Sequence, residues 1–334
     1  MSLTRPPHMP AAISAGIFGF VVALGAMPTF AQTTSGYPGK PIRLVAPFPA
    51  GGVLDFFARI TAQKMSERMG QQVVVENRAG AAGIIGFEYV AKSAPDGYTL
   101  LMGSAGTIGI NPSLYAKLPF DVNRDFIGVA LIATGPVMIA VHPSLPAKSV
   151  RELIALARMR PGALNYATAG SGTTSHLSTE LFGLLAGIKL THVPYKGSGP
   201  AAAAFVGGEV GVYIENIPVF IPYLQSGRLR ALGVSGETRF PTLPQIPTVA
   251  EGGQKGYDAA GWWGIFVPAG TPKDVVGRLH TEVAAIVELP DVRERMLEQG
   301  AIPSGIGGEK FAAFVRAEQL KWGKVVRASG ARVD

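Results

Sequence analysis

Short apolar runs and amphipathic segments alternate along most of the chain. The apolar run at 41–46 ends at a proline and predicts a buried parallel strand. From Asp55 onwards, apolar residues share one helical stripe up to Gly70, where the glycine predicts the end of a helix. A β-branched strand at 72–76 and a helix at 85–91 follow. Strands that alternate with helices at this spacing predict parallel α/β sheets with right-handed connections.

The same alternation continues towards the C-terminus. We expect further strands at 98–102, 164–167, 190–193, 210–215 and 229–234. We expect further helices at 149–159, 272–288, 290–299 and 308–329, and helices that end near residues 186, 206 and 225.

Two long β-like runs stand apart from this alternation. The run 127–142 is apolar and is interrupted by Gly135-Pro136, and the run 257–267 carries two adjacent tryptophans. A chain that passes from one lobe to another must also return, so these runs predict two crossovers. A length of 334 residues also favours two domains over one. We therefore expect two lobes, residues 32–134 plus 256–334 and residues 135–255.

The first 31 residues differ from the rest of the chain. Arg5 precedes an uncharged apolar run at 11–27, and Thr29 and Ala31 are small residues of the kind that signal peptidase prefers. These features predict a secretory signal peptide cleaved near Ala31, and hence a periplasmic protein. An uncleaved N-terminal anchor is the alternative, although the apolar run is short for a membrane span. After residue 31, no run approaches the ~20 apolar residues that a membrane helix needs.

Composition narrows the chemistry. The chain has no cysteine, which excludes disulfides, thiolate metal sites and cysteine nucleophiles. Its histidines lack the spacing of a metal site, so we expect neither a metal nor a cofactor. The net charge is +7, or +6 without Arg5, but Lys and Arg are scattered and form no block of five or more. This distribution favours small anions over nucleic acid as ligands.

Four polar, glycine-bearing turns fall at the carboxyl ends of predicted strands, at 48–55, 103–107, 170–176 and 195–199. Ligands of open α/β sheets bind outside these ends. Two of the turns belong to each predicted lobe, so a cleft between the lobes would be lined from both sides. Hydroxyls, glycines and helix N-termini hold carboxylates through neutral donors. The turns therefore predict a site for a small carboxylate.

Other interpretations of these turns have less support. The 170–176 turn nearly matches a dinucleotide fingerprint, but Ser175 replaces the third glycine, and no P-loop is present. His176 beside the hydroxyls of 173–175 suggests a secreted serine-type hydrolase, yet the chain has no Gly-x-Ser-x-Gly elbow. Helix capping by 173–175 and packing of His176 are the simpler interpretations. Asp55 either caps its own helix or recognises an ammonium group.

Aromatic residues add apolar surface to the predicted cleft. Trp262 and Trp263 fall on opposite faces of an extended run, so one could face the cleft while the other packs in a core, although core packing of both is the default. Phe48 and Tyr195 each lie inside a glycine turn, where there is less core to fill, and are better cleft candidates.

Six motifs together resemble the Bordetella uptake gene family, the extracytoplasmic solute receptors of tripartite tricarboxylate transporters. They are PFPAGGVLD at 47–55, ENRAGAAG at 76–83, PDGYTL at 95–100, HVPYKG at 192–197, LPQIPT at 243–248 and PAGTP at 268–272. The motifs extend across the whole chain that would remain after signal cleavage.

This resemblance implies an α/β fold of the periplasmic-binding-protein type II, with two parallel-sheet lobes joined by two crossover strands. It implies a monomeric receptor, not an enzyme, that closes on a carboxylate and passes it to the membrane permease subunits of a tripartite transporter. Service to a signalling kinase is an alternative. In that family, main-chain amides, hydroxyls and bridging waters from the turns matching 48–55 and 170–176 hold the ligand carboxylate.

The chain departs from the family pattern at two places. Leu54 stands where the family usually has a small hydroxyl, and Gly211 and Glu215 replace two acidic positions of a Gly-x-Val-Asp-x-x-x-Asp-Asn pattern. A more apolar first turn predicts a ligand with more hydrocarbon than malate or citrate, such as an aromatic or longer aliphatic carboxylate. The predicted ligand-binding residues are Phe48, Ala50, Gly51, Gly52, Asp55, Ser104, Gly106, Thr107, Gly170, Ser171, Thr173, Thr174, Ser175, His176, Tyr195, Glu215 and Asn216.

Overall fold

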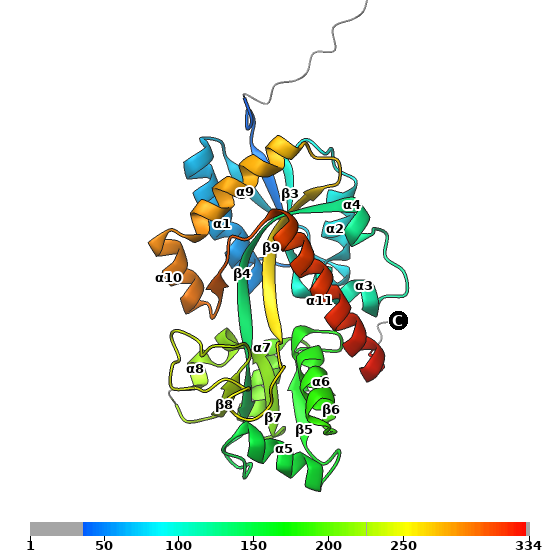
Figure 1. Cartoon of the computed structure of the whole chain (residues 1–334), viewed down its shortest axis with the longest axis vertical. Helices are drawn as coiled ribbons and strands as arrows, with labels where there is room; N and C mark the ends of the chain where they lie inside the picture. Colours follow the sequence, from blue (N-terminus) through cyan, green and yellow to red (C-terminus); the bar gives the residue numbers. More distant parts are fainter. Residues whose placement is uncertain (1–35, 225, 332–334) are drawn as a thin grey trace, which may run out of the picture. The chain divides into compact units, whose positions relative to one another are not determined.

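The computed structural model describes residues 36–224 and 226–331. Ten strands form a mixed sheet in the order β2-β1-β3-β9-β4-β7-β5-β6, with β8 and β10 also paired to β4. The long strands β4 and β9 run side by side through its middle (Figure 1). The strands are β1 (Ile42–Ala46), β2 (Val73–Asn77), β3 (Thr99–Ser104), β4 (Phe126–Val141), β5 (Asn165–Thr168), β6 (Thr191–Pro194), β7 (Val212–Asn216), β8 (Arg230–Val234), β9 (Ala260–Pro268) and β10 (Ile302–Pro303). The predicted signal peptide and its cleavage near Ala31 lie outside the described residues.

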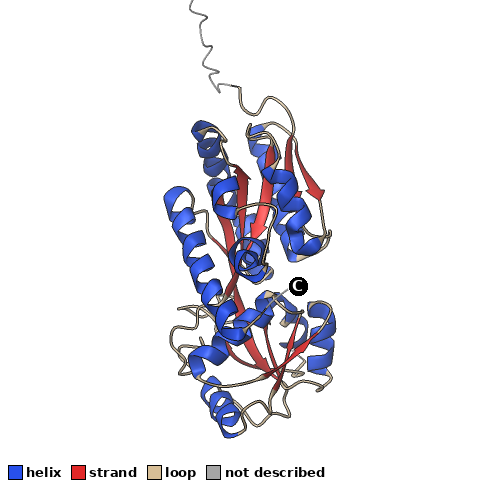
Figure 2. Cartoon of the chain, turned by 90° about the vertical axis from the view of Figure 1, so that its right-hand side faces the viewer, coloured by secondary structure: helices blue, strands red, loops and turns tan. Residues whose placement is uncertain are grey.

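Helices lie on either side of the strands (Figure 2). The α-helices are α1 (Val53–Met69), α2 (Ile84–Ala91), α3 (Asn111–Leu114), α4 (Val122–Asp125), α5 (Val150–Met159), α6 (Thr174–Ala186), α7 (Ser198–Val206), α8 (Ile221–Leu224), α9 (Lys273–Val287), α10 (Pro290–Glu298) and α11 (Gly308–Ser329). Short helical turns stand at η1 (Ala81–Gly83), η2 (Ala105–Ile110) and η3 (Ile217–Val219). Within the described part of the chain, no helix has the length and apolar character to cross a membrane.

The sheet has two strand groups, each with three parallel strands, and β4 pairs antiparallel with strands of both groups. β1 pairs in parallel with β2 and β3, and β5 pairs in parallel with β6 and β7. The first part of β4, through Pro136, pairs antiparallel with β9, and the part from Val137 onwards pairs with β7 and β8. Pro136 has no N–H to donate, so it falls where β4 changes partners. The lobe boundaries at 134/135 and 255/256 stay a prediction.

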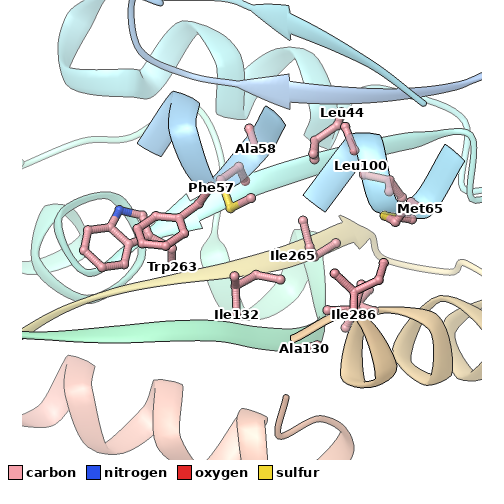
Figure 3. Close-up of a cluster of buried hydrophobic side chains, with 14 of the residues drawn as sticks. Leu44, Phe57, Ala58, Met65, Leu100, Ala130, Ile132, Trp263, Ile265 and Ile286 are labelled. Atoms are coloured by element: carbon pink, nitrogen blue, oxygen red, sulfur yellow. The ribbon is translucent and has the colours of Figure 1, made fainter. Parts of the chain in front are cut away.

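Apolar side chains fix the first helix against the crossover strands. Leu44, Phe57, Met65 and Ile265 belong to one buried cluster between β1, α1, β9 and α9 (Figure 3). The ring centroids of Phe57 and Trp263 are 4.4 Å apart. Burial of such residues contributes roughly 1.5–3 kcal/mol each. This packing holds the start of α1, and the turn before it, beside β9.

Two local predictions need correction. The sequence predicts a loop at 103–107, but β3 continues to Ser104 and a π-helical turn, η2, follows, because the Ser104 and Thr107 side chains cap it reciprocally. The helix expected to end near residue 225 is reduced to η3 and α8. Pro218 and Pro222 lie inside that segment and cannot donate helical hydrogen bonds, which breaks the helix.

Candidate functional site

A cavity of about 290 Å³ lies between the two strand groups, and residues from both groups line it. Its walls are Phe48, Leu54, Ala82, Ser104, Ala105, Gly106, Thr107, Asn111, Leu114, Tyr115, Ser171, Gly172, Thr173, Thr174, Asn216, Gly261, Trp262 and Trp263. None of these side chains carries a formal charge. A ligand anion would therefore meet neutral donors and apolar surface.

The turn between β1 and α1 is held by Asp55 from behind the cavity. Its carboxylate accepts hydrogen bonds from Gly51 N (2.9 Å), Arg59 Nε (2.8 Å) and Asn77 Nδ2 (2.8 Å). Asn77 Nδ2 also donates to Phe48 O at 3.0 Å. Burial opposes ionisation of Asp55, but these hydrogen bonds outweigh it and lower its pKa. Asp55 is thus 3% exposed and occupied by internal partners, and it does not line the cavity.

The second wall comes from the end of β3 and the η2 turn. Thr107 Oγ1 accepts from Ser104 N at 3.0 Å and lies 3.2 Å from Ser104 Oγ. Gly83 stands against this wall, since a Cβ there would come within 2.9 Å of the Thr107 methyl group and 3.5 Å of Phe48 Cζ. Only a glycine permits this close approach. The Ser104 hydroxyl is half-buried at the cavity surface.

The third wall is the loop from Gly170 to Thr174, which leads into α6. Thr173 Oγ1 donates to Gly170 O at 2.7 Å. Ser175 Oγ accepts from Ala169 N at 3.0 Å and is fully buried, so it holds the loop without reaching the cavity. The loop presents Ser171, Thr173 and Thr174 to the cavity at the N-terminus of a 13-residue helix. Such a helix end favours negative charge.

The floor of the cavity contains Asn216, which its neighbour Glu215 orients. Glu215 Oε1 accepts from Asn216 N and Asn216 Nδ2, both at 2.8 Å. Glu215 Oε2 accepts from Ser198 Oγ at 3.0 Å and from Tyr213 OH at 3.3 Å. Burial raises the pKa of Glu215, although these donors oppose the shift. Glu215 is therefore an internal partner of Asn216 and lies outside the cavity lining.

The two tryptophans of β9 belong to different buried clusters and both contribute to the lining. Trp263 packs with Phe57, while Trp262 packs with Phe311 in a second cluster. Trp262 Nε1 donates to Glu318 Oε2 at 3.0 Å. The indole N–H of Trp262 thus points to α11, and its ring is fixed in place.

The structure brings together part of the predicted site. Eight predicted residues line the cavity, and their role as ligand contacts stays a prediction: Phe48, Ser104, Gly106, Thr107, Ser171, Thr173, Thr174 and Asn216. Nine predicted residues do not line it: Ala50, Gly51, Gly52, Asp55, Gly170, Ser175, His176, Tyr195 and Glu215. Tyr195 instead packs against the Phe205 cluster and bonds to Glu209. Ala50, Gly51 and Gly52 are exposed.

Other lining residues were missing from the predicted set. Asn111, Leu114 and Tyr115 follow the η2 turn. They lie neither at the end of a predicted strand nor in a glycine turn, so the sequence pattern does not indicate them. Leu114 lies against the loop from Gly170 to Thr174, since a Cβ on Gly172 would come within 2.4 Å of the Leu114 side chain. Leu54 was singled out by its departure from the family pattern, and it does line the cavity.

Comparison with known proteins assigns the family. The profile described as tripartite tricarboxylate transporter family receptor matches residues 57–331. The chain belongs to this receptor family. Protein BugT of Bordetella pertussis is similar to it, with 37% identity over 316 residues that cover 94% of this chain and 96% of BugT.

Solved structures of relatives share the fold of this receptor. R. palustris Rpa4515 with adipate has a TM-score of 0.78 and 40% identity, and the match covers 89% of this chain and 100% of that chain. MatC from Rhodopseudomonas palustris with bound malate has a TM-score of 0.72 and 33% identity, covering 87% of this chain and 100% of that chain. These relationships confirm the predicted α/β fold of a periplasmic binding protein.

The chain is a periplasmic solute-binding receptor of the tripartite tricarboxylate transporter and Bug family. Its family and structural neighbours are receptors and not enzymes, so the serine-type hydrolase alternative is wrong. The geometry agrees, since Ser175 is fully buried and His176 Nδ1 already accepts a hydrogen bond from Gly172 N. Within the residues that the structure describes, no group of three or more His, Asp or Glu side chains could hold a metal.

Proposed function

We propose that this receptor captures a small carboxylate with a hydrocarbon body in the cavity between the two strand groups. The observation that carries the proposal is a lining without charged side chains, in which hydroxyls and the N-terminus of α6 share the cavity walls with Leu54, Leu114 and Trp263. Neutral donors bind a carboxylate by charge-assisted hydrogen bonds, and the apolar wall contributes by covering methylene groups. The solute is therefore a longer aliphatic or an aromatic carboxylate.

The relatives support this choice of ligand. Rpa4515, with 40% identity to this chain, has a structure with adipate, whereas MatC, with 33% identity, has malate bound. Adipate carries its two carboxylates at the ends of a methylene chain, which matches a cavity with polar and apolar walls. We therefore use adipate as the first ligand to test.

We propose that delivery follows closure of the two lobes, 32–134 plus 256–334 and 135–255, through bending of β4 and β9. β4 pairs with strands of both groups, and β9 lies beside it and begins at Ala260, opposite Pro136, where β4 changes partners. Bending at two strands changes the cavity and the outer surface together, so a closed, loaded form differs from the open one. The loaded monomer would then pass its solute to the permease subunits of a tripartite tricarboxylate transporter.

Calorimetric titration tests the ligand assignment. The protein lacking residues 1–31 is titrated with adipate, terephthalate, malate and citrate at pH 7.5. We expect one site, with adipate or terephthalate bound more tightly than malate or citrate. Tight citrate binding with no heat from adipate or terephthalate would overturn the assignment.

Uptake measurements test the delivery step. Cells that contain the receptor and the permease subunits should accumulate labelled adipate, and deletion of either should abolish accumulation. Unchanged uptake in cells without the receptor would contradict the transport role and favour service to a signalling kinase.

A further inference from the structure

His176 lies behind the ligand loop and holds one of its amides. The imidazole is in the first turn of α6 and is 7% exposed. Its Nδ1 atom lies 3.0 Å from Gly172 N. A backbone N–H can only donate, so Nδ1 must be unprotonated to accept this hydrogen bond. Gly172 lines the cavity and has a φ of +76°, a left-handed conformation that the hydrogen bond helps to fix.

A second histidine supports the neighbouring glycine of the same loop. His192 Nε2, on β6, lies 2.6 Å from Thr168 Oγ1, and that hydroxyl accepts from Gly170 N at 3.2 Å. The rings of His176 and His192 stack with centroids 4.1 Å apart and an interplanar angle of 9°. The paired rings therefore support two amides of the loop, one directly and one through Thr168.

Two other titratable groups surround the paired rings. Tyr166 on β5 stacks on His192 with ring centroids 5.1 Å apart. Glu180, one turn along α6, has its Oε1 atom 4.0 Å from His176 Nε2 and accepts from Tyr166 OH. Glu180 favours a cationic His176, whereas burial and a close second imidazole disfavour it. The stacking distance makes simultaneous protonation of both rings unfavourable.

We infer that His176 is a positioning residue of the ligand loop, and that its protonation releases Gly172 and weakens solute binding. When Nδ1 takes up a proton, its new N–H faces the Gly172 N–H and the loop loses an acceptor. Burial lowers the pKa of His176, and burial together with His176 lowers that of His192 to about 4. The neutral ring is therefore present at pH 7.5, and affinity falls as the pH is lowered through the depressed pKa of His176. This inference rests on the proposed function of the cavity.

The substitution His176→Asn separates positioning from simple packing. The asparagine Oδ1 can take the place of Nδ1 as an acceptor for Gly172 N–H but does not titrate. We expect this variant to bind adipate at pH 7.5 within about threefold of the wild type. Between pH 7.5 and 4.5, the adipate affinity of the wild type should fall by about three- to tenfold more than the adipate affinity of the variant. This additional fall corresponds to the contribution of one hydrogen bond. Protonation of adipate affects both proteins equally and cancels in this comparison.

His142→Asn is the matched control. His142 bonds to Ser144 outside the cavity lining, so this variant should keep the wild-type pH profile. If His176→Asn keeps the wild-type profile as well, the inference is wrong. If adipate, terephthalate, malate and citrate all fail to bind the wild type at pH 7.5, the proposed function is wrong.

Nuclear magnetic resonance tests the loop without any ligand. We expect the Gly172 amide shift to follow the titration of the His176 ring nitrogens in the wild type and to lose that titration in His176→Asn. A Gly172 amide that ignores the protonation of His176, or an Nδ1 that carries a proton at pH 7.5, would overturn the inference whether or not adipate binds.

Discussion

Truncation of Leu54 should change which carboxylate the receptor prefers. Leu54 is 7% exposed, lines the cavity and belongs to the buried cluster of α1. The substitution Leu54→Ala removes hydrocarbon from the wall that would cover the body of the ligand. Burial of one methylene contributes about 0.8 kcal/mol, so loss of cover over one or two ligand methylenes weakens adipate binding by about 0.8–1.6 kcal/mol. This corresponds to roughly a four- to fifteenfold higher Kd. Malate, with less hydrocarbon, should lose about threefold or less.

Leu44→Ala is the control for stability. Leu44 is fully buried in the same cluster but does not line the cavity. Each truncation should lower the free energy of unfolding by about 2–5 kcal/mol. An effect of lower stability on ligand binding would therefore appear in both variants. Calorimetric titrations at 10 °C give the adipate and malate Kd of each protein. An unchanged ratio of the adipate Kd to the malate Kd in Leu54→Ala, or an equal change of that ratio in Leu44→Ala, would show that Leu54 does not select the ligand.

Two further predictions concern stability. The indole N–H groups of Trp262 and Trp322 both donate to Glu318 Oε2, at 3.0 and 2.9 Å, and Glu318→Ala leaves these buried donors without an acceptor. We expect the free energy of unfolding in urea to fall by about 2–4 kcal/mol. A fall below about 1 kcal/mol would contradict the shared hydrogen bonding. The lowered pKa values of His176 and His192 make the unfolded chain bind more protons than the folded chain, so stability falls as the pH drops from about 6.5 towards 4. For His192, the loss of unfolding free energy is about 1–2 kcal/mol once solvent screening of its partly exposed ring is allowed for. If the Tm of His192→Asn fell as steeply with decreasing pH as the Tm of the wild type, this contribution of His192 would be contradicted.

The secondary structure follows from local pattern more fully than the site does. Amphipathic stripes and β-branched runs place α1, α11 and β4 within a few residues, because burial on one face selects the period of the pattern. Residues 103–107 are an exception, since the reciprocal bonds between Ser104 and Thr107 turn an apparent loop into a π-helical turn. Side-chain chemistry within three residues decided that structure.

The candidate site shows a different limit of sequence reasoning. Glycine turns indicate where a ligand can approach, but not which way a nearby polar side chain points. Asp55 and Glu215 suit a binding site by type, yet tertiary partners such as Asn77 and Ser198 turn them away from the cavity. His176 is displaced in the same way by its bond to Gly172. Each of these residues supports the cavity wall from behind it.

The absence of charge in the lining has a consequence for specificity. Carboxylate recognition by Arg or Lys would favour the most highly charged anion, whereas hydroxyls and amides leave the hydrocarbon body to discriminate between ligands. Leu54 and Trp263 lie where that discrimination would take place. The overall positive charge of the chain can still attract anions without selecting among them.

A crystal structure of the protein lacking residues 1–31, grown with saturating adipate, would show whether the cavity between the two strand groups holds the carboxylate. We expect one carboxylate within hydrogen-bond distance of the Ser104 or Ser171 hydroxyls or of the Thr174 amide at the start of α6, with the methylene chain against Leu54 and Trp263. Adipate bound outside this cavity, or a cavity that holds only water under those conditions, would contradict it.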